Sequence, residues 1–94
     1  MPHVHLNGSL VDAHAATVSV ADPGFTLGDG VFTTLLVEQG RPLALERNLR
    51  RLLGSAERIG IPIPDAALLR GAVASLLAAD GVQRARLRIT LTAC

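Results

Sequence analysis

Residues 28–42 read Gly-Asp-Gly-Val-Phe-Thr-Thr-Leu-Leu-Val-Glu-Gln-Gly-Arg-Pro, and this stretch indicates a β-sheet around which the rest of the chain can pack. Val, Phe and Thr are concentrated in residues 31–38 and favour a half-buried strand. Gln39-Gly40 then predicts a turn into a short second strand, residues 41–44. Successive side chains of a strand point to opposite faces. One face of the first strand carries Phe32, Thr34 and Leu36, and the other carries Val31, Thr33, Leu35 and Val37.

Upstream of this stretch the sequence predicts a β-hairpin and a loop. Residues 4–6 and 9–11 flank Asn7-Gly8, a pair that favours the tight turn between two antiparallel strands. Alternation is weak over residues 13–20. Asp22-Pro23-Gly24 then predicts a turn into a loop that ends at Gly28-Asp29-Gly30.

Downstream the periodicity changes from that of a strand to that of a helix. Residues 45–59 carry apolar side chains at helical spacing, and Gly60 followed by Pro62 ends the pattern. Asp65 is the predicted N-cap of a second helix, which Asp80-Gly81 ends. The predicted apolar face of that second helix consists of Leu68, Leu69, Ala72, Val73, Leu76 and Leu77.

The last strand predicted by alternation covers residues 84–92. The order of these elements predicts an α+β fold, a small and mainly antiparallel sheet with two helices on one side. The length of 94 residues allows one domain, residues 1–94, with one core.

Composition excludes several classes of function. All nine residues counted as Lys+Arg are arginine, so no lysine of this chain can form a Schiff base or act as a base. A formal net charge of +1 and two aromatic residues, Phe25 and Phe32, argue against binding to nucleic acid or to an anionic membrane surface. No apolar stretch approaches the roughly 20 residues of a membrane span, and a single cysteine, Cys94, cannot form an internal disulfide. We therefore expect a soluble cytoplasmic chain.

The polar side chains of helix 45–59 fall on two unlike flanks. One flank holds Glu46 and Arg50, four residues apart and able to pair, together with Glu57. The other flank lacks acidic residues and carries Asn48, Arg51 and Ser55, beside Arg47 and Arg58. An arginine without an acidic partner next to hydrogen-bonding side chains is suited to a phosphate or carboxylate. The alternative is a solvated arginine surface, which from this helix alone is the commoner case.

Other motifs carry less weight. Gly28-Asp29-Gly30 lacks the third glycine and the following helix of a dinucleotide-binding loop, so a tight turn is the better interpretation. His3, His5 and His14 have no cysteine or acidic support for a metal site and are interpreted as surface histidines. The last predicted strand carries alternating arginines at Arg84, Arg86 and Arg88. These residues could bind a polyanion, but such residues more often shield an exposed face or edge of a sheet. We identify no catalytic residue and no metal ligand.

Taken together, the motifs resemble the opening domain of the fold type IV, class IV aminotransferases. This pyridoxal-phosphate-dependent family includes branched-chain aminotransferases, D-amino acid aminotransferase and 4-amino-4-deoxychorismate lyase. The resemblance rests on Asp22-x-Gly24-Phe25-x-x-Gly28-Asp29-Gly30-Val31-Phe32-x-Thr34, Gly40-Arg41-Pro42, Leu45-x-x-x-Leu49-x-Arg51-Leu52-x-x-Ser55-Ala56 and Ile61-x-Ile63-Pro64.

The resemblance implies roles for four residues. It implies that Arg51 holds the phosphate of pyridoxal 5'-phosphate, and that Phe32, Thr34 and Leu36 line the substrate side of that cofactor. The sequence departs from the family at four positions. Thr33 stands where glutamate is common, and Asn48 stands where histidine is common. Pro23 stands where arginine is common, and Leu36 stands where a basic residue is common. The Phe-Thr-Thr sequence at residues 32–34 is closer to some of the lyases than to the transaminases.

The resemblance also implies a larger enzyme, because the family's Schiff-base lysine lies in a second domain that these 94 residues lack. The complete enzyme would be a transaminase acting on an amino acid, or a lyase acting on aminodeoxychorismate. We expect these residues to be inactive alone and to associate, either as a homodimer or with the missing large domain. The alternative is a non-catalytic module that binds a phosphate ligand or serves dimerisation.

Overall fold

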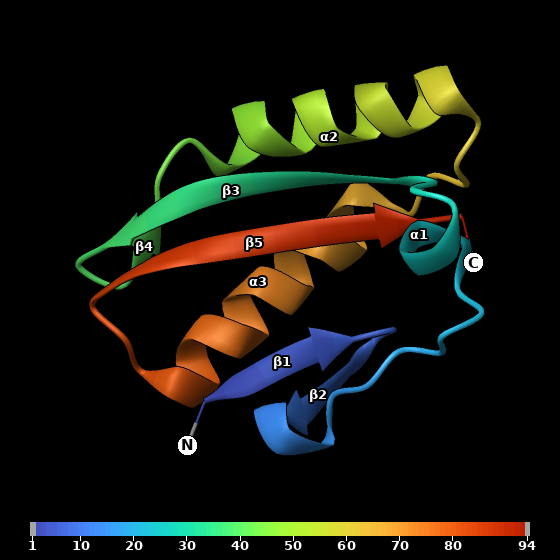
Figure 1. The fold of residues 1–94 in the computed structure, drawn as a ribbon. Helices are drawn as coiled ribbons and strands as arrows, with labels where there is room; N and C mark the ends of the chain where they lie inside the picture. The colour runs from blue at the N-terminus through green and yellow to red at the C-terminus, as the bar shows by residue number, and fades with distance from the viewer. Residues whose placement is uncertain (1, 94) are drawn as a thin grey trace.

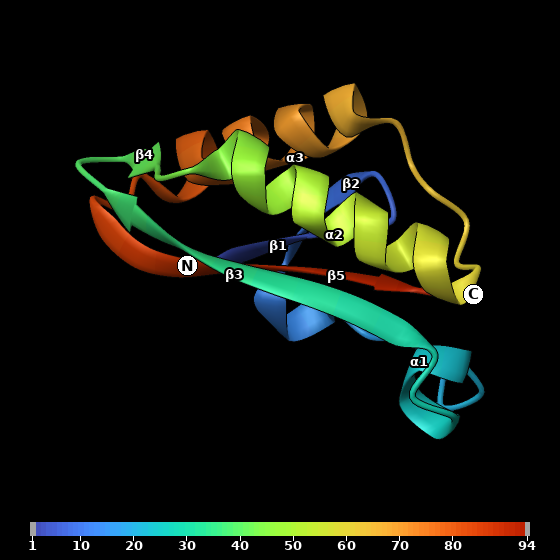
Figure 2. The same cartoon turned by 90° about the horizontal axis from the view of Figure 1, so that it is seen from above.

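The computed structural model describes residues 2–93, so Cys94 lies outside the described residues. The chain is an α+β fold in which two helices cover one face of a three-stranded sheet (Figures 1 and 2). The elements are β1 (His3–Leu6), β2 (Ser9–Asp12), a 3-10 turn (Ala13–Ala15), α1 (Pro23–Thr26), β3 (Gly30–Glu38), β4 (Arg41–Pro42), α2 (Leu45–Ile59), α3 (Ala66–Asp80) and β5 (Arg84–Thr92).

The predicted first hairpin is confirmed. β1 pairs with β2 in antiparallel register from His3 opposite Asp12 to Leu6 opposite Ser9. The turn between them needs two residues with positive φ, which Asn7 (51°) and Gly8 (89°) supply.

The strands form two antiparallel sheets where the sequence predicted one. β1 and β2 form the first sheet, and the second has the order β4-β3-β5. β3 and β5 are paired along their whole length, from Gly30 opposite Thr92 to Glu38 opposite Arg84. The sheets are separate because β1 packs against α3 and is not paired with β5.

The helix bounds agree with the local signals in the sequence. α2 ends before Gly60, whose φ of 79° is in the left-handed region that glycine favours. α3 begins after Asp65, whose side chain accepts a hydrogen bond from the Ala67 amide at 2.9 Å. β4 is shorter than the predicted strand 41–44, because Ala44 adopts the left-handed conformation (φ 54°) where the chain turns into α2.

The core lies between the three-stranded sheet and the two helices. Leu35 and Val37 of β3 are 4% and 1% exposed, so the odd-numbered face of this strand points inward. The remaining buried apolar residues are Leu49, Leu52, Ala56, Ile61, Val73 and Leu87. The predicted apolar face of α3 is only partly used, since Leu68 remains 69% exposed.

Hydrogen bonds to the Asp22 carboxylate fix the segment that precedes β3. The predicted turn at Asp22 is one turn of helix, α1, because the Asp22 carboxylate accepts a hydrogen bond from the Gly24 amide at 2.7 Å. The hydroxyl of Thr92 donates to the other oxygen of Asp22 at 3.2 Å. A Cβ atom on Gly24 would lie 2.8 Å from the Cβ of Thr92, so a glycine is required for this close approach to β5. Across residues 2–93, none of the helices combines the length and the apolar character that a membrane span requires.

Candidate cofactor and substrate site

The outer face of β3 carries three of the residues singled out in the sequence. Phe32, Thr34 and Leu36 are exposed and point away from the helices, since Leu35 and Val37 on the opposite face are buried. Phe32 is 59% exposed and Leu36 is 52% exposed. The structure therefore brings these three side chains together on one face, while their role in binding remains a prediction.

β5 adds arginines to this outer face. Arg88 lies opposite Thr34 and Arg86 lies opposite Leu36 in the antiparallel register. The guanidinium carbon of Arg88 is 4.1 Å from the centre of the Phe32 ring, a cation–π distance. Within residues 2–93 neither arginine has a carboxylate within ion-pair distance. The face thus combines apolar side chains with two free cations, which suits a small carboxylate-bearing molecule.

Arg86 and Arg88 could not be placed on this face from the sequence. Their alternation with Leu87 showed that they share one side of a strand. The partner strand could not be deduced from that alternation, and only the pairing of β5 with β3 places them beside Thr34 and Leu36.

Arg51 lies on α2, on the helical side of the sheet. Its side chain is exposed, and the part of the chain that the structure describes offers it no carboxylate within ion-pair distance. Arg51 is therefore not on the outer face of β3 with Phe32. It lies about 60° around the helix from Asn48, since each residue turns the helix by about 100°.

The predicted partner Asn48 is not available to a ligand. It is 8% exposed, and its Oδ1 accepts a hydrogen bond from the Thr33 hydroxyl at 2.8 Å. Its Nδ2 donates to the Ala44 carbonyl at 2.9 Å. Asn48 ties α2 to β3, and of the three predicted side chains only Arg51 and the half-buried Ser55 remain for an anion.

The flank of α2 that holds Glu46 and Arg50 forms a different ion pair from the expected one. Glu46 is bound by Arg70 of α3, with Nε 2.7 Å from Oε2 and Nη2 2.9 Å from Oε1, and not by Arg50. The two-pronged geometry explains this choice, because guanidinium and carboxylate planes match. The hydrogen bonds from Arg70 lower the pKa of Glu46, and those to Glu46 raise the pKa of Arg70.

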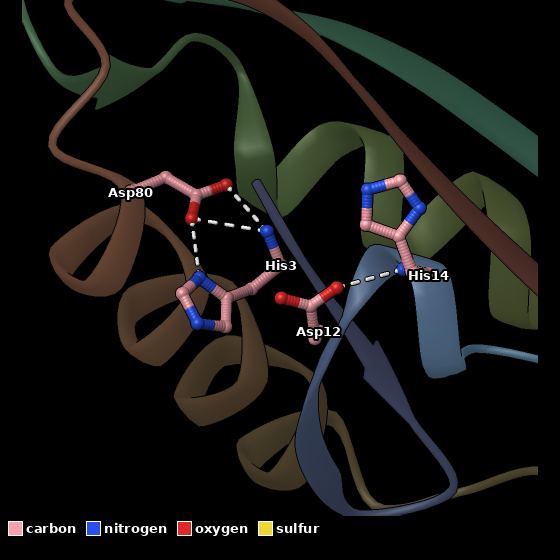
Figure 3. Close-up of polar contacts among 4 residues, drawn as sticks. All are labelled: His3, Asp12, His14 and Asp80. Atoms are coloured by element: carbon pink, nitrogen blue, oxygen red, sulfur yellow. Dashed lines mark hydrogen bonds and ion pairs between the residues drawn. The ribbon is translucent and has the colours of Figure 1, made fainter. Parts of the chain in front are cut away.

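Two of the three histidines make hydrogen bonds within the fold. His3 Nδ1 lies 2.7 Å from Asp80 Oδ1, and the His14 amide donates to Asp12 Oδ1 at 2.9 Å (Figure 3). The hydrogen bonds from the side chain and the amide of His3 lower the pKa of Asp80. Among residues 2–93 no group of three histidine, cysteine, aspartate or glutamate side chains could hold a metal ion.

A phosphate group fits the surroundings of Arg51. A phosphate monoester carries up to two negative charges and accepts hydrogen bonds. Arg51 offers an exposed guanidinium without a competing carboxylate in the described part of the chain, and Ser55 lies one helical turn away.

Residues 30–93, which contain Arg51 and the whole of the outer face, match the family described as amino-transferase class IV. The chain belongs to this family, whose members depend on pyridoxal phosphate.

Individual relatives agree with this assignment. The chain is 39% identical over 70 residues to the bifunctional aminodeoxychorismate lyase and D-amino acid transaminase of Mycobacterium tuberculosis, which covers 74% of this chain and 24% of that protein. Its fold matches the fold IV transaminase CpuTA1 of Curtobacterium pusillum with a TM-score of 0.84 and 37% identity, over 97% of this chain and 34% of that one. It matches the branched-chain aminotransferase of Thermoproteus uzoniensis with a TM-score of 0.81 and 33% identity, over 95% and 31%. The chain thus spans about a fifth to a third of the length of its relatives.

Proposed function

We propose that these 94 residues form the small domain of a cytoplasmic pyridoxal-phosphate-dependent enzyme, either a transaminase or a 4-amino-4-deoxychorismate lyase. The observation that carries the proposal is the environment of Arg51, which is exposed and occupies the position of the family's phosphate-binding motif. In the described part of the chain, no carboxylate lies within ion-pair distance of Arg51. When bound, pyridoxal phosphate supplies an electron sink for a bond change next to the substrate amine.

In this proposal Arg51 holds the phosphate by charge-assisted hydrogen bonds. Phe32, Thr34 and Leu36 shape one wall of the substrate pocket. The register that puts Arg86 and Arg88 beside them supports a substrate carrying a carboxylate, which an amino acid and aminodeoxychorismate both do. The basic residue that Leu36 replaces in the family would then have a counterpart on β5.

The amine that reacts with the cofactor must come from outside these residues, because the chain contains no lysine. The proposal therefore includes a partner, which is the larger domain of the same enzyme, with a homodimer as the expected assembly. The 94 residues alone are expected to be inactive.

The experiment that tests the role of Arg51 is a titration of the 94-residue chain with pyridoxal phosphate, monitored by NMR of the backbone amides. We expect Arg51→Ala to weaken binding by about tenfold or more, because charge-assisted hydrogen bonds each contribute about 1.5–3 kcal/mol. The matched control is Arg50→Ala, since Arg50 is also exposed on α2 but lies about 100° further around the helix. Equal loss in both variants would contradict a specific phosphate site, and binding that Arg51→Ala leaves unchanged would overturn the proposal.

A non-catalytic module is the second candidate, and the absence of lysine favours it. Such a module would bind a phosphate ligand or serve dimerisation without taking part in a reaction. Adding the large domain of a related transaminase distinguishes the two: a catalytic half restores turnover with an amino acid donor, and a binding module does not.

A further inference from the structure

The turn that joins β1 to β2 consists of Asn7 and Gly8, and both residues are exposed. A Cβ atom built on Gly8 would meet no atom within 4 Å beyond its neighbours in the chain, so open space surrounds this residue. Figure 1 shows the hairpin of β1 and β2, in blue, at the edge of the molecule. The turn is therefore accessible to water.

An asparagine that precedes a glycine can react with its own backbone. The backbone nitrogen of the glycine attacks Cγ of the asparagine side chain, and the bond from Cγ to the side-chain nitrogen breaks, which releases ammonia. The product is a five-membered cyclic imide, which water opens at either of its two carbonyl carbons. Glycine favours the attack because it has no side chain to hinder its nitrogen. Asparagine counts among the thermolabile residues of proteins.

The attacking nitrogen in this turn is that of Gly8. In the part of the chain that the structure describes, its N–H donates no hydrogen bond. The Ala13 amide donates to the Pro2 carbonyl at 3.2 Å, and the alternation along the ladder then makes Leu6 and Ser9 a hydrogen-bonded pair. The two turn residues lie beyond this last pair. Attack by the Gly8 nitrogen thus breaks no backbone hydrogen bond of the hairpin.

Two aspartates of the chain also precede a glycine, and in both pairs the glycine nitrogen is occupied. In Asp29-Gly30 the glycine amide donates to the Gly28 carbonyl at 2.9 Å. In Asp80-Gly81 the glycine amide donates to the Leu77 carbonyl at 2.9 Å. These hydrogen bonds would have to break before either nitrogen could attack. The backbone therefore favours the reaction at Gly8 over these two positions.

The second asparagine of the chain, Asn48, lacks every feature that favours the reaction. Leu49 follows it in place of a glycine, and its side chain is buried. Its Oδ1 accepts from the Thr33 hydroxyl, and its Nδ2 donates to the Ala44 carbonyl. Of the two asparagines, Asn7 alone combines an exposed side chain with a following glycine.

We propose that Asn7 is a site of spontaneous deamidation, which converts it to aspartate or isoaspartate and thereby modifies the first hairpin. The net reaction consumes one water and releases one ammonia, and it needs no oxidant or cofactor. Opening of the imide at Cγ gives aspartate. Opening at the backbone carbonyl carbon gives isoaspartate, in which the main chain runs through Cβ and Cγ. The proposal does not depend on Arg51 or on pyridoxal phosphate.

The two products affect the hairpin differently. Aspartate tolerates the positive φ at position 7, and Asp-Gly is a favoured pair in this type of turn. Isoaspartate adds one carbon atom to the main chain between Leu6 and Ser9, and a two-residue turn has no room for that atom. Both products add a negative charge to a chain with a formal net charge of +1, so ion-exchange chromatography separates them from the parent.

The test is a timed incubation of the 94-residue chain in mildly alkaline buffer, followed by mass spectrometry of its peptides. We expect the peptide that contains Asn7 to gain about 1 Da, because a hydroxyl replaces an amino group, while the peptide that contains Asn48 stays unchanged. A free Leu-Asn-Gly-Ser peptide in the same buffer serves as the clock. Conversion of Asn48 as fast as Asn7 would overturn the proposal, as would an unmodified Asn7 once the free peptide has fully reacted.

Hydrogen exchange at the Ser9 amide tests the effect on the hairpin. We expect several-fold faster exchange in the separated isoaspartate form and the parent's rate in Asn7→Asp. Asn7→Gly is the matched control, because glycine also adopts positive φ in this turn and cannot deamidate, so incubation should leave its exchange unchanged. An isoaspartate form that exchanges at the parent's rate would refute the modified hairpin, and so would equal acceleration in incubated Asn7→Gly.

Discussion

Thr33 and Asn48 each occupy a position where the class IV resemblance leads one to expect a different residue, and they contact each other. The Thr33 hydroxyl donates to Asn48 Oδ1 at 2.8 Å, and Asn48 is buried at the interface of β3 and α2. Neither departure could be connected with the other from the sequence, because 15 positions separate them. Their contact joins the substrate-face strand to the helix that carries Arg51.

We expect Asn48→Ala to destabilise the chain by about 1–3 kcal/mol, because it leaves the partly buried Thr33 hydroxyl without its acceptor. Thr33→Val should lose less in the Asn48→Ala background than in the parent, with a coupling of about 0.5–1.5 kcal/mol. Urea unfolding of the four chains measures this cycle. The control is Thr34→Val on the outer face, expected to stay within about 0.5 kcal/mol. Additive effects of Thr33→Val and Asn48→Ala would show that their hydrogen bond contributes nothing.

Among the elements, the first hairpin is held to α3 by a polar contact between His3 and Asp80. Asp80 is the last residue of α3, where a negative charge opposes the helix dipole. The imidazole and the amide of His3 offset this by donating to its carboxylate at 2.7 and 3.1 Å (Figure 3). The contact spans 77 positions of the chain.

This contact predicts acid sensitivity. Hydrogen bonds from His3 hold the pKa of Asp80 below its usual value of about 4, so its contribution to stability is fully present above pH 4 and is lost as the pH falls through the lowered value. We expect Asp80→Asn to be less stable than the parent at pH 5 and to lose less stability between pH 4 and pH 2. Thermal unfolding at several pH values checks both, with Glu57→Gln on exposed α2 as the control. Parallel curves for parent and Asp80→Asn would refute the assignment.

Elements with local signals were predicted from the sequence, and contacts between elements were not. Asp65 and Gly60 mark helix ends through their own backbone and side chains, so α2 and α3 were located to the residue. The division into two sheets, the Glu46–Arg70 pair and the position of Arg86 depend on which segments meet in space. Periodicity within one element carries no information about which elements contact one another.

Considered as one body, the chain leaves much apolar surface uncovered. Phe25 and Leu27 of the segment before β3 are 70% and 73% exposed, and Phe32 and Leu36 lie on the open face of the sheet. Surfaces of this kind mark sites where another protein surface packs.

We expect the isolated chain to self-associate through the outer face of β3. Leu36→Glu should raise the monomer fraction, because it removes apolar area and places a charge opposite Arg86. Sedimentation over a range of concentrations measures this, with Leu43→Glu as a matched change at a leucine exposed elsewhere. A parent chain that is monomeric at every concentration would count against this prediction and against the missing partner.

The pairing of β3 with β5 has a consequence for how the protein is made. Glu38 and Arg84 are neighbours in the sheet but 46 positions apart in the chain. Synthesis proceeds from the N-terminus, so β3 leaves the ribosome well before its partner strand exists. Leu35 and Val37 then cannot complete their core cluster until Val73 and Leu87 have been added. Distant pairings of this kind slow folding, and this domain can acquire its native sheet only when almost the whole of the 94-residue sequence has been translated.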